Sequence, residues 1–257
     1  MNAKTCFIGD SHVAALRQAL SLQSCEHFGK RMDIFGSRGD SLRNSLEVSK
    51  GRMTSQNKRV RKSFRLTGGR VFIDLSAYDR FCLVGFNTGI DFAVRLAETY
   101  SPQIFALPDR QPVSRAFFIE MMAAYLQGTI ASEILDLLRL HTDKPLYLIT
   151  NPNMSDAILD HASGKIYAEL ADIGNMEALH ECYVEALERV FANRATILPQ
   201  PRQTLAKTLL TLKDHSSDSR RLTQKSAEHP EDDFKHMNAR FGALVLEDFF
   251  SALDSAR

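Results

Sequence analysis

The stretch that decides the fold is Cys6-Phe7-Ile8-Gly9-Asp10-Ser11-His12, where an apolar run stops at a polar turn. Such a run is typical of a buried strand in a parallel sheet that is covered on both faces. Apolar residues then recur at helical spacing at Val13, Leu16 and Leu20. Ser11 is therefore predicted at a strand-to-helix turn, where its hydroxyl is exposed and the first backbone N–H groups of the helix point towards any anion beside it.

A second polar cluster, Asp233-Phe234-Lys235-His236, lies near the other end of the chain. A serine alone is a weak nucleophile and needs a base, which in turn needs an orienting acid. Asp233 and His236 supply both, because a three-residue spacing lets one turn bring the carboxylate against the imidazole. Asp232 competes for the role of the acid, but the spacing favours Asp233. The sequence thus predicts a serine hydrolase assembled from the two ends of the chain.

These residues resemble the SGNH (GDSL-like) hydrolase superfamily, which carries four sequence blocks in a fixed order. The corresponding segments here are Gly9-Asp10-Ser11, Gly36-Ser37-Arg38-Gly39-Asp40-Ser41, Gly85-Phe86-Asn87 and Asp233-x-x-His236. Two positions depart from the family pattern: Thr88 stands where an Asp usually follows the Asn, and His12 stands where most members have an apolar residue. The resemblance spans positions 9 to 236, which is nearly the whole chain.

The resemblance implies a role for each block. Ser11 is the expected nucleophile, His236 the base and Asp233 the acid. The backbone N–H groups of Ser11 and Gly39 and the side-chain amide of Asn87 are the expected oxyanion hole. Each residue also has a plainer interpretation: Ser11 as a helix N-cap, Asn87 as a turn cap and Gly39 as a turn glycine.

Further histidines and one arginine are candidates for other roles near the site. His12 is expected to be exposed on the first helical turn. His12 and Arg38, from the second block, are candidate substrate contacts. His229 and His12 are the alternative histidines to His236. No cofactor and no metal are expected. The sequence Asp10-Ser11-His12 also matches the first ligand pair of metallophosphoesterases, but Arg43 stands where their next Asp belongs and the histidine after Asn87 is missing. A two-metal site without those ligands would not hold its geometry.

Short apolar runs alternate with helical patterns, which predicts a parallel sheet with crossover helices. The expected fold is a three-layer α/β/α sandwich with a five-stranded parallel sheet in flavodoxin-like order. The four blocks then follow strands at the carboxyl edge, where open parallel sheets place their functional groups. The expected strands are Thr5–Ile8, Met32–Phe35, Phe81–Val84, Leu146–Thr150 and Ala195–Leu198.

Helices and connecting segments can also be predicted from the pattern. Buried helical stripes run from Met176 to Phe191 and from Phe117 to Leu138, the latter interrupted at Gly128. A C-terminal helix is expected to begin at Met237. A hairpin is predicted at about 60–76 around Gly68-Gly69, and a mobile polar loop at about 201–230. The basic run Lys58–Arg65 is interpreted as a solvated connector or edge strand, or as a clamp for an anionic partner. Residues 1–257 are expected to form a single domain.

Composition excludes several classes of function. The formal net charge of +1 gives no reason to expect nucleic acid or an anionic membrane as a partner. The four cysteines form no CxxC pair and are expected to be reduced and buried, and no signal peptide is visible, so the cytoplasm is the expected location.

The expected function is a serine esterase or O-acyl hydrolase, deacetylase-like, acting on a small or carbohydrate-borne ester. The alternatives are a carbohydrate O-acyltransferase using the same serine, or a catalytically weak binding protein. No oligomeric state is predicted.

Overall fold

The central sheet has five parallel strands. The computed structural model describes residues 3–104, 107, 109–223 and 227–255. The strands of its main sheet are β1 (Thr5–Gly9), β2 (Met32–Gly36), β6 (Arg80–Val84), β9 (Leu146–Ile149) and β11 (Thr196–Leu198). They lie in the order β11-β9-β6-β1-β2, and every neighbouring pair is parallel. Counted along the chain this is the flavodoxin-like order 2-1-3-4-5, so the predicted fold class is confirmed, and each predicted strand matches within one residue at either end.

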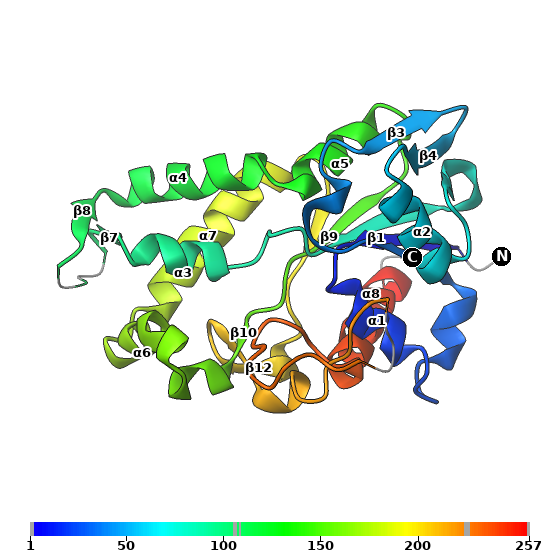
Figure 1. Cartoon of the computed structure of the whole chain (residues 1–257). Coiled ribbons are helices and arrows are strands. Elements are labelled where there is room, and N and C mark those ends of the chain that lie inside the picture. The colour runs from blue at the N-terminus through cyan, green and yellow to red at the C-terminus, as the bar shows by residue number, and fades with distance from the viewer. Residues whose placement is uncertain (1–2, 105–106, 108, 224–226, 256–257) are drawn as a thin grey trace.

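Helices cover both faces of this sheet (Figure 1). Along β1 the side chains alternate: Cys6 and Ile8 belong to the larger hydrophobic core, and Phe7 belongs to a second core on the opposite face. The second core is closed by α1 (Val13–Ala19) and α8 (Ala239–Ser255). The larger core includes residues of α2 (Lys58–Gly68), α3 (Asp91–Ala97), α4 (Arg115–Gln127), α5 (Ile130–Arg139), α6 (Lys165–Asp172) and α7 (Met176–Phe191). Burial on both faces explains why the inner strands β1, β6 and β9 are nearly continuous apolar runs.

The region around residues 60–76 differs from the predicted hairpin. Residues 58–68 form helix α2, in which the Asn57 side chain accepts a hydrogen bond from the backbone N–H of Arg59 at the N-terminus. Gly69, at φ 75°, ends the helix, so Gly68-Gly69 is a helix terminus and not a hairpin turn. The basic run therefore lies on a helix whose buried face includes Val60 and Phe64, which corrects the connector or edge-strand interpretation.

The antiparallel hairpin lies earlier in the chain. It joins β3 (Leu46–Ser49) to β4 (Arg52–Ser55) through Lys50 and Gly51, both at positive φ, and β5 (Ile73–Asp74) pairs with β4. Two consecutive residues at positive φ are typical of the tight turn that joins twisted antiparallel strands.

The predicted polar loop at about 201–230 is only partly a loop. It contains β12 (Leu205–Lys207) and β13 (Leu210–Thr211), which form a small sheet with β10 (Met154–Ser155) in the order β10-β13-β12. Residues 224–226 of this segment lie outside the described part of the chain. A further pair of short strands, β7 (Tyr100–Pro102) and β8 (Gln111–Val113), lies at the N-terminal end of α4 (Figure 1).

The predicted helical stripes are largely confirmed. Gly128 ends α4 just before Thr129 caps α5. The residues of the α7 stripe are all buried: Met176, Leu179, Tyr183, Leu187, Val190 and Phe191. Phe117 is an exception, because its side chain is 52% exposed on α4. The C-terminal helix begins at Ala239, two residues later than expected, because Asn238 is its N-cap. None of the helices among the described residues is long and apolar enough to cross a bilayer.

Candidate active site

Three predicted site residues from the two ends of the chain form a continuous hydrogen-bonded chain. Ser11 lies on the turn between β1 and α1, and its Oγ is 2.9 Å from Nε2 of His236. The Nδ1 atom of the same ring is 2.8 Å from Oδ2 of Asp233. These distances are those of good hydrogen bonds. Asp232, the competing acid, is exposed to solvent.

The contact between α1 and α8 explains how residues 225 positions apart meet. Ser11 lies just before α1 and His236 lies just before α8, so the packing of the two helices fixes the distance between the two side chains. Gly242 is at the point of closest approach, because a Cβ atom there would lie 2.2 Å from the carbonyl oxygen of Ala15. Only glycine allows the two backbones to approach this closely.

The segment that carries His236 is anchored by Asn238. The Asn238 Oδ1 atom accepts hydrogen bonds from the backbone N–H groups of Arg240 and Phe241, and so caps α8. Its Nδ2 donates to the backbone oxygens of Asp214 and Ser217, at 2.7 and 2.9 Å. The polar segment before the Asp/His pair is therefore bonded directly to the start of the last helix.

Asp233 is held in its ionised form. Burial opposes its ionisation, but hydrogen bonding to His236, the charge of that ring and the backbone N–H groups of Lys235 and His236 outweigh this effect and hold the pKa of Asp233 well below its ordinary value. An ionised carboxylate accepts the Nδ1 proton of His236 and leaves Nε2 as an acceptor for the Ser11 hydroxyl, a tautomer assigned from the hydrogen bonds. This arrangement allows proton transfer from serine to imidazole.

Two further imidazoles flank His236. The ring of His229 is stacked on it with a centroid separation of 3.9 Å, and the ring of His12 lies nearly parallel at 5.1 Å. Among the described ring pairs His12 and His229 make no contact with each other, which puts His236 between them. His12 is therefore half-buried against the ring of His236 and is not the exposed residue that the sequence predicted.

The group His229, Asp233 and His236 has metal-ligand chemistry but poor metal geometry. Within the described part of the chain, these residues are the group of three whose ligand atoms all lie within 4.8 Å of one another. An imidazole nitrogen binds a metal ion through a lone pair in the plane of its ring. Because the rings of His229 and His236 lie only 10° from parallel and are stacked, an ion in the plane of one ring is well out of the plane of the other. The Nδ1 atoms of His229 and His236 both lie within 2.9 Å of Oδ2 of Asp233. The geometry therefore fits two ring N–H donors that share one carboxylate acceptor better than it fits a metal centre.

The Gly85-Phe86-Asn87 turn is held in an unusual conformation beside the serine. All three residues have positive φ, at 85°, 64° and 60°. Left-handed backbone at a non-glycine residue is strained and persists only where its surroundings enforce it. The buried Asp10 carboxylate does so, because it accepts the backbone N–H of Phe86 at 2.7 Å and that of His12 at 3.0 Å. Asp10 thus ties this turn to the turn that carries Ser11.

Thr88, at the position where the family pattern has an Asp, completes the same turn. Its hydroxyl donates to the backbone oxygen of Gly85 at 2.8 Å, and its backbone N–H donates to Oδ1 of Asn151 at 2.8 Å. Asn151 follows β9, so the turns after three neighbouring strands are bonded to one another through side chains. The departure from the family pattern therefore has a structural role in this chain.

Of the residues predicted to hold the oxyanion or to contact substrate, some line a cleft in the structure and others do not. The Asn87 side chain is exposed and lines a cleft together with His12, the chain neighbour of Ser11; Ser11 and His236 are not among the residues that line it. Gly39 begins a short 3-10 turn after β2 with φ 53°, and nothing lies within 4 Å of where its Cβ would be. The described contacts include none between Gly39 and Ser11 or His236, so its oxyanion role stays a prediction. Arg38 is exposed and is not among the residues that line the cleft.

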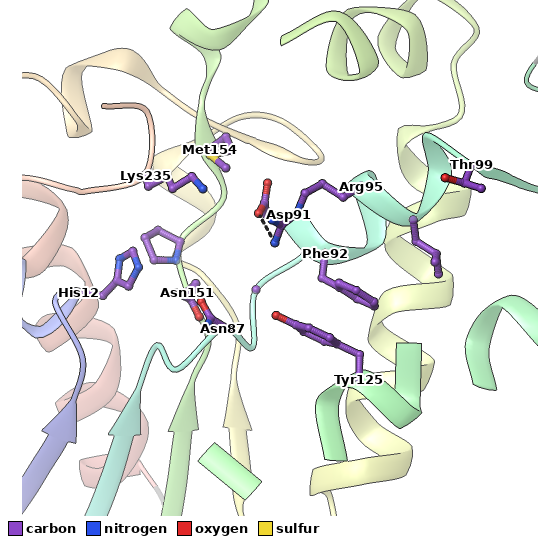
Figure 2. Close-up of a pocket in the computed structure, with 13 residues that line it drawn as sticks. His12, Asn87, Asp91, Phe92, Arg95, Thr99, Tyr125, Asn151, Met154 and Lys235 are labelled. Carbon is purple, nitrogen blue, oxygen red and sulfur yellow. Dashed lines mark ion pairs between the residues drawn. The ribbon is translucent and has the colours of Figure 1, made fainter. Parts of the chain in front are cut away.

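The first cleft, of about 610 Å³, runs from the carboxyl ends of the strands along α3 (Figure 2). Figure 2 shows His12, Asn87 and Asn151 on the loops after their strands, and the parallel rings of Phe92 and Tyr125 further along the cleft. A second cleft of about 440 Å³ is lined by residues of α6 and by the segment around Asp233. Four residues line both clefts: Asp91, Arg95, Met154 and Lys235.

Several residues at the site were not assigned a role from the sequence. The sequence prediction includes Asp10 only as part of a motif and assigns no role to Asn151. Asn151 follows a predicted strand at the edge where functional groups gather, a signal that was present in the sequence. The sharing of Asp233 by two imidazoles had no sequence signal, because it depends on how a long segment folds back on itself.

Comparison with known proteins gives only distant structural likenesses. No family model matches the sequence, and no curated protein matches it. Among solved structures, a family two carbohydrate esterase from Clostridium thermocellum in complex with cellohexaose aligns with a TM-score of 0.40 and 11% identity, over 100% of this chain and 65% of that chain. The periplasmic domain of a lipopolysaccharide acetyltransferase from Salmonella ser. Paratyphi A gives 0.42 and 10%, over 98% and 85%. A carbohydrate acetylesterase family member from Sinorhizobium meliloti gives 0.37 and 12%, over 97% of both chains. At these values the likenesses carry no conclusion about activity.

Proposed function

We propose that this protein is a serine-dependent ester hydrolase of SGNH type that acts on a small or carbohydrate-borne ester. The observation that carries the proposal is the chain of two hydrogen bonds, 2.9 Å from Ser11 to His236 and 2.8 Å from His236 to Asp233, beside an open cleft. A serine, an imidazole and an ionised carboxylate in this arrangement are the parts of an acyl-transfer site.

In the acylation step the Ser11 Oγ attacks the ester carbonyl carbon, and its proton passes to Nε2 of His236. Asp233 stabilises the imidazolium that forms and keeps the ring in the required tautomer. The carbonyl oxygen becomes an oxyanion, for which Asn87 and the backbone N–H groups of Ser11 and Gly39 are the proposed donors. The bond to the alcohol oxygen then breaks, and His236 returns the proton to that oxygen.

In the deacylation step a water molecule replaces the alcohol. His236 removes a proton from the water as the water oxygen attacks the acyl carbon, and a second tetrahedral intermediate forms. When the bond between this carbon and Ser11 Oγ breaks, His236 gives the proton back to the serine. The products are a carboxylic acid and the free enzyme.

The two clefts support a substrate that extends beyond the ester group itself. The first cleft begins at His12 and Asn87, next to the proposed nucleophile, and continues into the second through their common lining residues. Its lining combines aromatic rings, such as Phe92 and Tyr125, with amide and charged side chains. Apolar and aromatic walls with a few convergent polar groups are typical of sites for organic substrates.

The test is hydrolysis of a panel of short-chain aryl esters and acetylated sugars by the wild type and by Ser11→Ala. Ser21→Ala is the matched control, because Ser21 follows the other end of α1 and, among the described contacts, its hydroxyl donates to the backbone oxygen of Gln18. We expect turnover by the wild type and the control and none above background by Ser11→Ala. Full activity in Ser11→Ala would contradict the proposal, as would activity on phosphodiesters that EDTA abolishes and Mn²⁺ restores.

A further inference from the structure

Asp233 has two imidazole partners. The Nδ1 atom of His229 lies 2.9 Å from Asp233 Oδ2, the same oxygen that bonds Nδ1 of His236 at 2.8 Å. The other carboxylate oxygen, Oδ1, accepts the backbone N–H groups of Lys235 and His236. The carboxylate therefore serves four N–H donors, and the two rings compete for one oxygen.

His229 is held in place as a neutral donor. Its backbone N–H bonds to the oxygen of Ser219 at 2.9 Å, and its side chain is only 12% exposed. Among the described residues its buried Nε2 atom has no hydrogen-bond partner, so none of them would accept a second proton there. Burial lowers the pKa of His229, and the charge of a protonated His236 lowers it further against the opposing effect of Asp233. The Nδ1 proton therefore points at Asp233.

His229 disfavours a protonated His236 in three ways. The donor from His229 occupies part of the Asp233 oxygen that would otherwise stabilise the imidazolium. The stacked His229 ring keeps water away from one face of the charged form. A proton on either ring also repels a proton on the other.

Other charged groups surround the imidazole rings of His12, His229 and His236, and some of them favour a protonated ring while others oppose it. Asp10 and Asp233 favour a protonated His12, whereas Lys235 opposes it, and Arg221 opposes a protonated His229. At Nε2 of His236 the partner is the neutral hydroxyl of Ser11. A change at His229 leaves all of these groups in place, so its effect can be measured against a constant background.

We propose that His229 is a positioning residue of this site: it shares Asp233 with His236 and covers one face of that ring, and so extends the action of the base to lower pH. The inference rests on the proposed function for its consequence in catalysis. Its physical core, the coupling of two imidazoles through one carboxylate oxygen, does not depend on turnover.

The experiment compares three variants of the full chain with the wild type. His229→Phe keeps a ring against His236 but removes the donor, His229→Asn keeps an N–H donor but removes the ring, and His229→Ala removes both. His180→Gln is the matched control, because burial also lowers the pKa of His180 but it lies on α7, away from Asp233. Titration of the ¹⁵N-labelled histidine rings by NMR is recorded beside the pH–rate profile on an aryl ester.

In His229→Phe and His229→Ala we expect the His236 titration midpoint and the acid limb of the rate profile to move to higher pH by about 0.5 to 1 unit. We expect a smaller shift in His229→Asn and none in His180→Gln. A midpoint unchanged or shifted to lower pH in folded His229→Phe overturns the inference, and if that variant does not fold, His229→Ala and His229→Asn decide it by the same criterion. If no ester is hydrolysed, the proposed function fails, while the NMR titration still decides the coupling.

Discussion

Gly242→Ala is expected to separate the two ends of the proposed triad without touching any of its side chains. The added Cβ would lie 2.2 Å from the carbonyl oxygen of Ala15, so α1 and α8 must part by about 0.8 Å to reach even 3.0 Å. The atoms nearest to this Cβ position belong to the backbone of Ala15 and Leu16, which cannot rotate away as a side chain can. If this shift reaches His236, three residues before α8, the 2.9 Å bond to Ser11 lengthens to about 3.7 Å and is lost.

The expected result is a loss of about 10²-fold in kcat, the cost of misplacing reacting groups by about 1 Å. Overpacking adds a loss of stability of about 1–3 kcal/mol, which leaves the protein folded. The assay is ester hydrolysis together with thermal unfolding, and Gly29→Ala is the control because nothing lies within 4 Å of its Cβ position. A folded Gly242→Ala variant with the wild-type rate would refute the reasoning that helix packing sets the triad distance.

Three further substitutions test other parts of the site. Asp10→Ala removes the acceptor of two backbone N–H groups and should lower the free energy of unfolding by about 2–4 kcal/mol in urea titrations; a loss below 1 kcal/mol would show that Asp10 does not hold the strained turn. Asn87→Ala should lower kcat by about 10²–10³-fold with KM little changed, and an unfolded or fully active variant would make Asn87 a structural cap. Asp233→Asn should cost about 10⁴-fold in kcat through the wrong tautomer, whereas Asp232→Asn should be close to wild type; the reverse result would mean that the acid is placed one residue off.

The central sheet could be predicted from sequence because its inner strands β1, β6 and β9 are short apolar runs buried on both faces. The same logic failed at residues 58–69, where a polar helix presents only a narrow apolar face to the core. There the alternation around Gly68-Gly69 favoured a hairpin, although the pair ends a helix capped by Asn57. The hairpin turn at Lys50-Gly51 was not recognised, because the strands on either side of it are largely polar.

The site was predicted as far as its motifs are local. Ser11, Asp233 and His236 could be chosen from short segments whose chemistry is complementary, and the structure brings them together. The position of His12 against the base could not be predicted, because it depends on how α8 packs beside α1. The short strands within 201–230 could not be predicted either, since two- and three-residue strands carry no periodic signal. Of these strands β13 pairs with β10, far earlier in the chain, and β12 pairs with β13.

The proposed function depends most directly on whether Ser11 is a nucleophile activated by His236. The measurement is peptide mapping by mass spectrometry after treatment with a fluorophosphonate, on the wild type and on His236→Ala. We expect one adduct in the wild type, on the peptide that contains Ser11, and labelling slower by at least about 10³-fold in His236→Ala. An adduct on a different residue, or an unchanged rate of labelling in His236→Ala, would contradict the account.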